Sequence, residues 1–435
     1  MDISELYKIF TAHPSVTTDS RDCPKGSVFF ALKGASFNGN AFAKAALEKG
    51  CAYAVVDEKE YAAEGDSRYI LVDDCLKTLQ RLANHHRRTL GTKIIGITGT
   101  NGKTTTNNLL CSAIEAEGKK VVCNHTGSNM LNGVAAAFAQ NASLSGNLKA
   151  DYACIEVDEI ASVGVLPKLL PDCGLITNVG RAHLQGFGSF EGVVRTKGEL
   201  YDYLRAHGCT AFINAGDEHL TGISQGLDLI KYGLEGVEGA TVTGEVTVCD
   251  PYLNFRWHAE GGQWRDVKTH IIGSYNVMNM LAAACAGLHF GVTPGQIDHA
   301  LSSYVPKNNR SELERTAHNS LIIDAYNANP TSMAAALANF RDMKAGKKMA
   351  ILGDMGELGA VSAEEHQRVA DFLKTAGFDE VWLVGTEFGK TDCPFRKFND
   401  VDEVKKEIEA NRPEGFCILI KGSNSTRLYQ LPGLL

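Results

Sequence analysis

Short apolar runs alternate with helix-like stretches at the start of the chain. Three of these runs have the length and composition of strands: 27–32, 53–56 and 69–72. Between and after them, residues 41–49 and 75–86 carry apolar positions at helical spacing. Strands that alternate with helices usually form a parallel sheet covered by helices. The pattern therefore predicts a small α/β domain over residues 1–90.

The next apolar run, residues 93–97, leads into a loop that contains two glycines. A helix is predicted after the loop from Lys103 to about Glu117, with Gly118 as its stop. The further elements expected in this region are strands at 152–156, 174–178 and 211–214, a helix over 190–204, alternating β segments between 239 and 272, and a helix over 274–288. We expect a doubly wound, mostly parallel sheet in a central domain, residues 91–306.

The α/β pattern starts again from residue 320. Helical stretches separate four apolar strands: 321–324, 348–353, 380–384 and 417–421. A chain of 435 residues also exceeds what one hydrophobic core usually serves. The predicted fold class is therefore α/β with three domains, in which smaller α/β domains at 1–90 and 307–435 flank the central one.

Composition and charge narrow the class of protein. Hydrophobic residues make up 44% of the chain and charged residues 22%, as in ordinary globular proteins. No apolar run reaches the roughly 18 residues of a membrane helix, and the first residues lack a secretory signal, so we expect a cytoplasmic protein. A net charge of -8 without a long basic cluster gives no sign of a nucleic-acid surface. The twelve cysteines form no C-x-x-C pair, which argues against a zinc ribbon or a disulfide framework.

The loop Thr98-Gly-Thr-Asn-Gly-Lys-Thr-Thr105 has the chemistry that nucleotide phosphates require. Its glycines let backbone N–H groups face an anion, Lys103 supplies a positive charge, and Thr104 offers an oxygen to Mg²⁺. The spacing departs from the usual phosphate loop, because Ile97 stands where the first glycine belongs. The alternative is a glycine-rich turn with an incidental Lys-Thr. The order of strand, loop and helix favours ATP binding.

The same loop is similar to the phosphate loop of the Mur ligases, the ATP-dependent amide-forming enzymes of peptidoglycan precursor synthesis. Asp19-Ser-Arg21 with residues 26–34 resembles the family's N-terminal UDP-sugar module, and residues 178–190 with Lys197-Gly-Glu-Leu resemble its central metal region. Three segments resemble the members that join D-alanyl-D-alanine to UDP-N-acetylmuramoyl-tripeptide: residues 324–333, 353–359 with His366, and Lys421-Gly-Ser423.

Residues 106–171 resemble a different branch of the family. The segments 124–133 and 156–159 are closer to the ATP-binding subunit of a lipid II amidotransferase, whereas dipeptide-adding members would carry Asn-Asn-x-x-Gly and Glu-x-Gly-Ala here. Such subunits resemble a design with a four-cysteine zinc ribbon, which this chain lacks. Two alternatives stay open: an amidotransferase subunit that needs a glutaminase partner, and a nucleotide-binding protein without ligase turnover.

The resemblance implies a reaction in which ATP phosphorylates a substrate carboxylate to an acyl phosphate, which an amine then attacks. The expected substrates are UDP-N-acetylmuramoyl-tripeptide and D-Ala-D-Ala, and the protein is expected to act as a monomer. Thr104 and Glu156 would bind one Mg²⁺, with His183 and Lys197 on or near a second. In the family the lysine that matches Lys197 is carbamylated by CO₂, which turns a cation into a carboxylate.

Further roles follow from the same resemblance. Lys103, Glu156, His183 and Lys197 are the expected catalytic residues. The residues expected to bind ATP are Thr98, Gly99, Thr100, Asn101, Gly102, Lys103, Thr104, Thr105, Asn279 near the adenine, and Arg310 and Asp324 near the phosphates and ribose.

The UDP-sugar is expected to meet Ser20, Arg21 and Asn40, although Asn38-Gly-Asn40 stands where many relatives have Asp-Gly-His. A polar turn is the structural alternative for these three residues. For Arg310 and Asp324 the alternative is a surface ion pair or a helix cap.

Overall fold

The computed structural model describes residues 2–34, 37–124, 129–141, 150–158, 162–181, 184–307 and 309–435. The chain divides into two units, the first made of residues 1–93 with the short stretches 136–153 and 168–170, and the second of the remainder. Each unit is described by itself. Among the described residues, no helix is both long enough and apolar enough to cross a bilayer.

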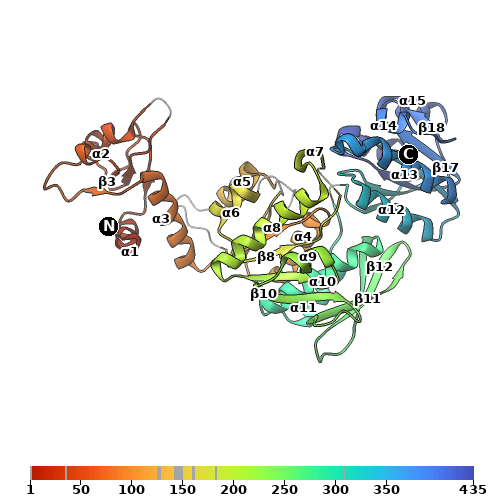
Figure 1. The fold of residues 1–435 in the computed structure, drawn as a ribbon, viewed down its shortest axis with the longest axis horizontal. Helices are drawn as coiled ribbons and strands as arrows, with labels where there is room; N and C mark the ends of the chain where they lie inside the picture. The colour runs from red at the N-terminus through yellow and green to blue at the C-terminus, as the bar shows by residue number, and fades with distance from the viewer. Residues whose placement is uncertain are drawn as a thin grey trace. The chain divides into compact units, whose positions relative to one another are not determined.

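The N-terminal unit (Figure 1, red to orange) contains a four-stranded parallel sheet in the order β1-β2-β3-β4. Its elements are β1 (Val16–Thr17), β2 (Val28–Phe30), β3 (Tyr53–Val56), β4 (Tyr69–Leu71), and the helices α1 (Ile3–Ala12), α2 (Ala43–Glu48) and α3 (Cys75–Leu90). Successive residues of β2 are all buried, because side chains on both faces of this strand are covered. The core joins β2 and β3 to apolar residues of all three helices.

The central sheet has nine strands in the order β13-β12-β11-β10-β9-β8-β5-β7-β6. The strands are β5 (Lys93–Thr98), β6 (Val121–Cys123), β7 (Tyr152–Glu156), β8 (Cys173–Ile176), β9 (Thr210–Asn214), β10 (Asp228–Leu234), β11 (Val242–Cys249), β12 (Tyr252–Ala259) and β13 (Arg265–Ile272). Strands β5, β8, β9, β10 and β11 pair in parallel, whereas β11, β12 and β13 form an antiparallel extension. Strand β5 lies beside both β7 and β8, so the loop that follows it emerges between their carboxyl ends.

Helices lie between and after these strands along the chain. They are α4 (Lys103–Ala116), α5 (Leu131–Asn141), α6 (Ser162–Leu169), α7 (Leu184–Phe187), α8 (Phe190–His207), α9 (Glu218–Ile223), α10 (Val277–His289) and α11 (Pro294–Ser303). Helix α4 begins within the loop, at Lys103, and its N-cap residue Gly102 has the left-handed conformation. The carboxyl ends of parallel strands at a point where chain order reverses are the usual ligand site of such sheets. The loop Thr98–Thr105 occupies such a place.

The C-terminal part has a six-stranded sheet in the order β14-β15-β19-β16-β17-β18, parallel except for β14 (Figure 1, blue). Its strands are β14 (Glu312–Arg315), β15 (Ser320–Asp324), β16 (Lys347–Gly353), β17 (Glu380–Val384), β18 (Arg396–Phe398) and β19 (Phe416–Lys421), and its helices are α12 (Pro330–Asp342), α13 (Ser362–Thr375), α14 (Thr386–Gly389) and α15 (Val401–Ala410). Apolar residues of α12 and α13 cover one face, and those of α15 cover the other. The predicted α/β class with mostly parallel sheets is confirmed, while the domain limits 90 and 306 stay predictions.

Candidate functional site

The loop after β5 depends on its two glycines. Gly99 has φ +136°, and a Cβ added there would lie 2.0 Å from Thr177 Oγ1. Gly102 has φ +78°, and its added Cβ would lie 2.3 Å from Asn279 Oδ1. Residues with a side chain rarely adopt a positive φ, and a Cβ atom would find no room at either position. The two glycines thus stand at the two positions where the loop backbone lies directly against neighbouring side chains, which accounts for their unusual spacing.

Residues that follow β8 hold the loop from the other side. Thr177 Oγ1 donates to the carbonyl of Asn101 at 2.6 Å, and Asn178 Nδ2 donates to the same carbonyl at 2.9 Å. In return, the Asn101 N–H donates to Asn178 Oδ1 at 3.1 Å. Thr100 Oγ1 accepts the N–H of Gly180 at 2.8 Å. These bonds fix the backbone of the loop before any ligand arrives, which favours anion binding by its N–H groups.

Replacing Gly99 with alanine is expected to weaken ATP binding about tenfold or more, because backbone strain of about 1–3 kcal/mol adds to the clash with Thr177. The measurement is the Kd for ATP by calorimetry. Gly118→Ala is the matched control, since Gly118 also has positive φ (+77°) but nothing lies within 4 Å of its added Cβ. Equal ATP affinity in the Gly99→Ala and Gly118→Ala proteins would contradict this role of Gly99.

Two side chains at the start of α4 lie where the predicted ATP site needs them. Lys103 Nζ donates to the carbonyl of Gly99 at 2.6 Å, which places the ammonium group against the loop. Thr104 Oγ1 donates to Glu156 Oε2 at 2.6 Å. Helix α4 and the end of β7 therefore bring a hydroxyl and a carboxylate together, as expected for one Mg²⁺ site.

The surroundings of Glu156 fit a divalent cation. Its side chain is 1% exposed, and its second oxygen, Oε1, accepts from Asn129 Nδ2 at 2.9 Å. Within the described part of the chain, Glu156 forms no ion pair, so its buried carboxylate has only neutral partners. A buried anion is stabilised when a cation neutralises it, and hard cations prefer oxygen ligands. The described residues contain no group of three or more His, Cys, Asp and Glu side chains that could hold a metal by themselves.

A cavity of about 470 Å³ opens in front of the loop. Nine of its lining residues were predicted from the sequence to bind ATP or metal: Thr100, Asn101, Gly102, Lys103, Thr105, Glu156, Asn279, Arg310 and Asp324. Others were not assigned a role from the sequence, among them Asn129, Asp158, Tyr275 and Tyr326. The central and C-terminal parts of the second unit thus line one cavity, and the hydrogen bond from Asn329 Nδ2 to Asn101 Oδ1 at 2.8 Å joins them.

The C-terminal side of the cavity combines an ion pair with a stacked arginine. Lys421 Nζ lies 2.5 Å from Asp324 Oδ2, and the Lys421 side chain is buried. The guanidinium of Arg310 lies 3.8 Å from the centre of the Tyr326 ring. Arg310 and Asp324 therefore do not form the surface ion pair of the structural alternative. Each has another partner and lines the cavity.

Replacing Lys421 with methionine is expected to lower the free energy of unfolding by about 3–5 kcal/mol, because the Asp324 carboxylate loses its buried partner. Denaturant unfolding measures this change. Lys374→Met is the control, since Lys374 pairs with Asp371 at 2.8 Å on the surface, and this substitution should change stability far less. A Lys421→Met protein as stable as this control would contradict the assignment of a structural ion pair.

Asn279 lies at the loop end of α10. Its Nδ2 donates to Asn276 Oδ1 at 2.7 Å, and its Oδ1 accepts from Thr106 Oγ1 at 3.1 Å. The side chain therefore links α10 to α4 beside Gly102 and also lines the cavity. Its predicted place near the adenine stays a prediction.

Lys197 lies on the face of α8 that packs on the sheet. The side chain is 1% exposed and shares this face with Tyr201 and Leu204, which contact Ile176 of β8 in one core cluster. Lys197 is therefore not a surface lysine. A carbamate forms when the uncharged form of a lysine amine reacts with CO₂. The other predicted residue of the second metal, His183, lies outside the described residues.

The three UDP-sugar candidates lie in the N-terminal unit and differ in their surroundings. The Arg21 side chain is exposed, and its bond to Asp19 lowers the pKa of that carboxyl to about 2. The carbonyl of Ser20 accepts from Lys49 Nζ at 2.7 Å. Asn40 is 1% exposed: its Nδ2 donates to Asp57 Oδ1 at 2.8 Å, and its Oδ1 accepts the Asp57 N–H at 2.9 Å. This geometry gives Asn40 a structural task, and substrate contact by the three residues stays a prediction.

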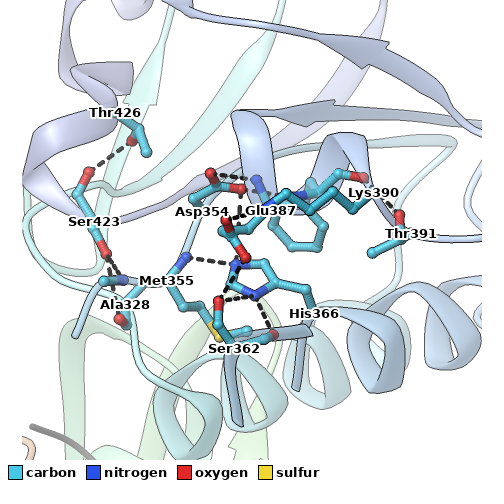
Figure 2. Close-up of polar contacts among 12 residues, drawn as sticks. Ala328, Asp354, Met355, Ser362, His366, Glu387, Lys390, Thr391, Ser423 and Thr426 are labelled. Carbon is cyan, nitrogen blue, oxygen red and sulfur yellow. Dashed lines mark hydrogen bonds and ion pairs between the residues drawn. The ribbon is translucent and has the colours of Figure 1, made fainter. Parts of the chain in front are cut away.

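The segment 353–359 is anchored by a buried histidine (Figure 2). His366 Nε2 accepts the N–H of Met355 at 3.0 Å, and His366 Nδ1 lies 2.7 Å from the carbonyl of Ser362, so the ring is neutral with its proton on Nδ1. Ser423 Oγ accepts the N–H of Gly356 at 2.8 Å. The motifs around His366 and Ser423, noted separately in the sequence, therefore hold one loop.

Comparisons with known proteins agree over the whole chain. Residues 14–87 match the profile described as Mur ligase family, catalytic domain, residues 97–287 the Mur ligase middle domain, and residues 309–424 the Mur ligase, glutamate ligase domain. The UDP-N-acetylmuramoyl-tripeptide--D-alanyl-D-alanine ligase of Bacillus subtilis (strain 168) is 30% identical, over 99% of this chain and 96% of that protein.

The chain belongs to the Mur ligase family. Solved structures of the family agree with its fold. MurF from Acinetobacter baumannii matches with a TM-score of 0.70 and 26% identity, over 96% of this chain and 92% of that one. MurF from Thermotoga maritima, solved in complex with ADP, matches with a TM-score of 0.70 and 23% identity, over 97% and 96%.

The predicted family, enzyme class and use of ATP are thereby confirmed for this Mur ligase. The alignment with the Bacillus subtilis protein covers 99% of the chain, and the resemblance of the segment 106–171 to another branch stays a prediction. The roles of single residues, Mg²⁺ and the carbamate on Lys197 remain proposals.

Proposed function

We propose that this Mur ligase joins D-alanyl-D-alanine to UDP-N-acetylmuramoyl-tripeptide, with ATP cleaved to ADP and phosphate. The observation that carries the proposal is a single cavity lined by Lys103 and Glu156, whose carboxylate Thr104 bonds, and also by Arg310 and Asp324. The Bacillus subtilis relative bears the name of this activity, and it is 30% identical to this chain over 96% of its own length. Action in the cytoplasm as a monomer belongs to the same proposal.

The chemistry has two steps. A carboxylate oxygen of the tripeptide attacks the γ-phosphorus of ATP, the bond to the β-phosphate oxygen breaks, and an acyl phosphate and ADP result. The dipeptide nitrogen then attacks the acyl carbon as a neutral amine, phosphate leaves with the former carboxylate oxygen, and the nitrogen gives up one of its two protons to solvent. Phosphoryl transfer depends mostly on positioning and charge, so the fixed loop N–H groups and Lys103 would hold the phosphates in line.

A divalent cation would be held by Glu156 and, after its hydroxyl turns, by Thr104. Mg²⁺ would neutralise charge on the phosphates and polarise the transferring group. A carbamate on Lys197, with His183, would supply oxygen and nitrogen ligands for a second cation. Asn129 would keep the Glu156 carboxylate turned toward Thr104 through its bond to Oε1.

Phosphate release with different acceptors tests the proposal. We expect release when both UDP-N-acetylmuramoyl-tripeptide and D-Ala-D-Ala are present, and only background release when either is omitted. Lipid II with an ammonia source should give none. Release only with lipid II and ammonia would assign the chain to the amidotransferase branch, and release with neither mixture would assign it to nucleotide binding without turnover.

A further inference from the structure

The side chain of Asn124 bonds to the backbone of Glu156 on both sides. Asn124 Oδ1 accepts the Glu156 N–H at 2.9 Å, and Asn124 Nδ2 donates to the Glu156 carbonyl at 2.8 Å. Strand β6 ends one residue earlier, at Cys123, and lies next to β7, which ends at Glu156. The side-chain amide of Asn124 therefore forms with Glu156 the kind of hydrogen bonds that a further backbone position of β6 would form with β7.

These bonds belong to a closed chain of contacts that returns to α4. Asn107 Nδ2 donates to Asn124 Oδ1 at 3.3 Å. Thr104 and Asn107 are three residues apart on one face of α4, and Thr104 bonds the Glu156 carboxylate. The path thus runs from α4 through Asn107 and Asn124 to the backbone of Glu156, and from the carboxylate of Glu156 back to α4.

We propose that Asn124 is a positioning residue that sets the Glu156 carboxylate against Thr104 for the metal that accompanies ATP. The proposal rests on the proposed function, which places a divalent cation at these two side chains. Glu156 is the last residue of its strand, where backbone direction is least constrained. Bonds to both its N–H and its carbonyl remove this freedom without touching the carboxylate.

Burial makes this arrangement sensitive to substitution. Asn124 is 4% exposed and Asn107 is 0% exposed. Removing the Asn124 amide leaves the buried N–H and carbonyl of Glu156 without these partners, which the backbone can only relieve by shifting. Substitutions that release a metal ligand from its supporting hydrogen bonds weaken metal binding by about 10- to 100-fold. The expected effect of Asn124→Ala on metal affinity is a loss of this size.

Mn²⁺ binding, followed by electron paramagnetic resonance with the analogue AMP-PCP bound, measures this effect without turnover. Asn124→Ala should weaken Mn²⁺ binding by about tenfold or more, and Asn107→Ala should give a smaller loss in the same direction. Binding of AMP-PCP in EDTA, measured by calorimetry, should stay unchanged in both variants. Asn319→Ala is the matched control, because Asn319 is a buried amide that bonds the backbone of Pro413 and Phe416 in the C-terminal part.

Each outcome of this experiment decides a claim. Mn²⁺ affinity unchanged in Asn124→Ala overturns the positioning role, and so does a loss of equal size in Asn319→Ala. If Asn124→Ala does not fold, unchanged affinity in Asn107→Ala overturns it. A Glu156→Gln protein separates the two proposals: if it binds Mn²⁺ as well as the unaltered protein, the metal site of the proposed function is wrong. Loss in Glu156→Gln with none in Asn124→Ala leaves that site intact and rejects only the role of Asn124.

Discussion

Lys103→Ala is expected to lower turnover by about 100- to 1,000-fold, because one preorganised charge at the transferring phosphoryl group is lost. Lys103 lies against the loop, with its Nζ 2.6 Å from the Gly99 carbonyl. The ammonium group therefore needs little rearrangement to meet the phosphates. The measurement is kcat/KM for ATP with both substrates saturating.

Lys119→Ala is the matched control for this substitution. Lys119 follows the same helix, α4, but its side chain is exposed and removed from the cavity lining. It should keep the turnover of the unaltered protein. Full turnover by Lys103→Ala would refute the assignment of Thr98–Thr105 as the phosphate loop, even though the fold of the family is established.

Lys197→Ala is expected to lose about 100-fold in turnover and to regain part of it with a small carboxylate such as acetate. The substitution removes a buried side chain and leaves space of its size on the inner face of α8. A free carboxylate can occupy this space and take the place of the carbamate oxygens. Turnover at rising acetate concentration, at constant ionic strength, measures the recovery.

Lys421→Ala separates this rescue from a general effect of anions. Lys421 is also buried and lines the cavity, but it pairs directly with Asp324 and needs no carbamate. Acetate should not restore its activity. A Lys197→Ala protein that retains full turnover, or one restored equally by chloride, would contradict the carbamate.

The strands and the phosphate loop could be predicted from the sequence because their signals are local. The apolar residues 93–97 and 380–384 become β5 and β17 almost without change. The glycines of the loop also act locally through backbone conformation, which a sequence shows directly. Short edge strands were missed: the apolar run of β6 is only three residues long, Val121–Cys123, and β18 reads Arg-Lys-Phe, so neither has an apolar run of the usual strand length.

The partners that hold the site could not be predicted, because they lie far apart in the sequence. Asn124 and Glu156 are separated by 32 positions, and Asn101 and Asn329 by 228. An asparagine after a strand predicts a turn as readily as a bond to a neighbouring strand. Asn40 shows another limit: its motif predicted substrate contact, which stays a prediction, but gave no sign that its amide bonds the Asp57 backbone and side chain. The order of the strands in the sheet, which the sequence does not show, decides which of the polar residues at the strand ends lie close together.

The central claim is that this site activates a carboxylate by phosphorylating it, and transfer of oxygen tests it most directly. The tripeptide is labelled with ¹⁸O in its terminal carboxylate and incubated with the protein, ATP and D-Ala-D-Ala. Mass spectrometry of the released phosphate should find one ¹⁸O atom for each amide bond formed. Amide product accompanied by phosphate without ¹⁸O would contradict the acyl phosphate and with it the proposed roles of Lys103, Thr104 and Glu156.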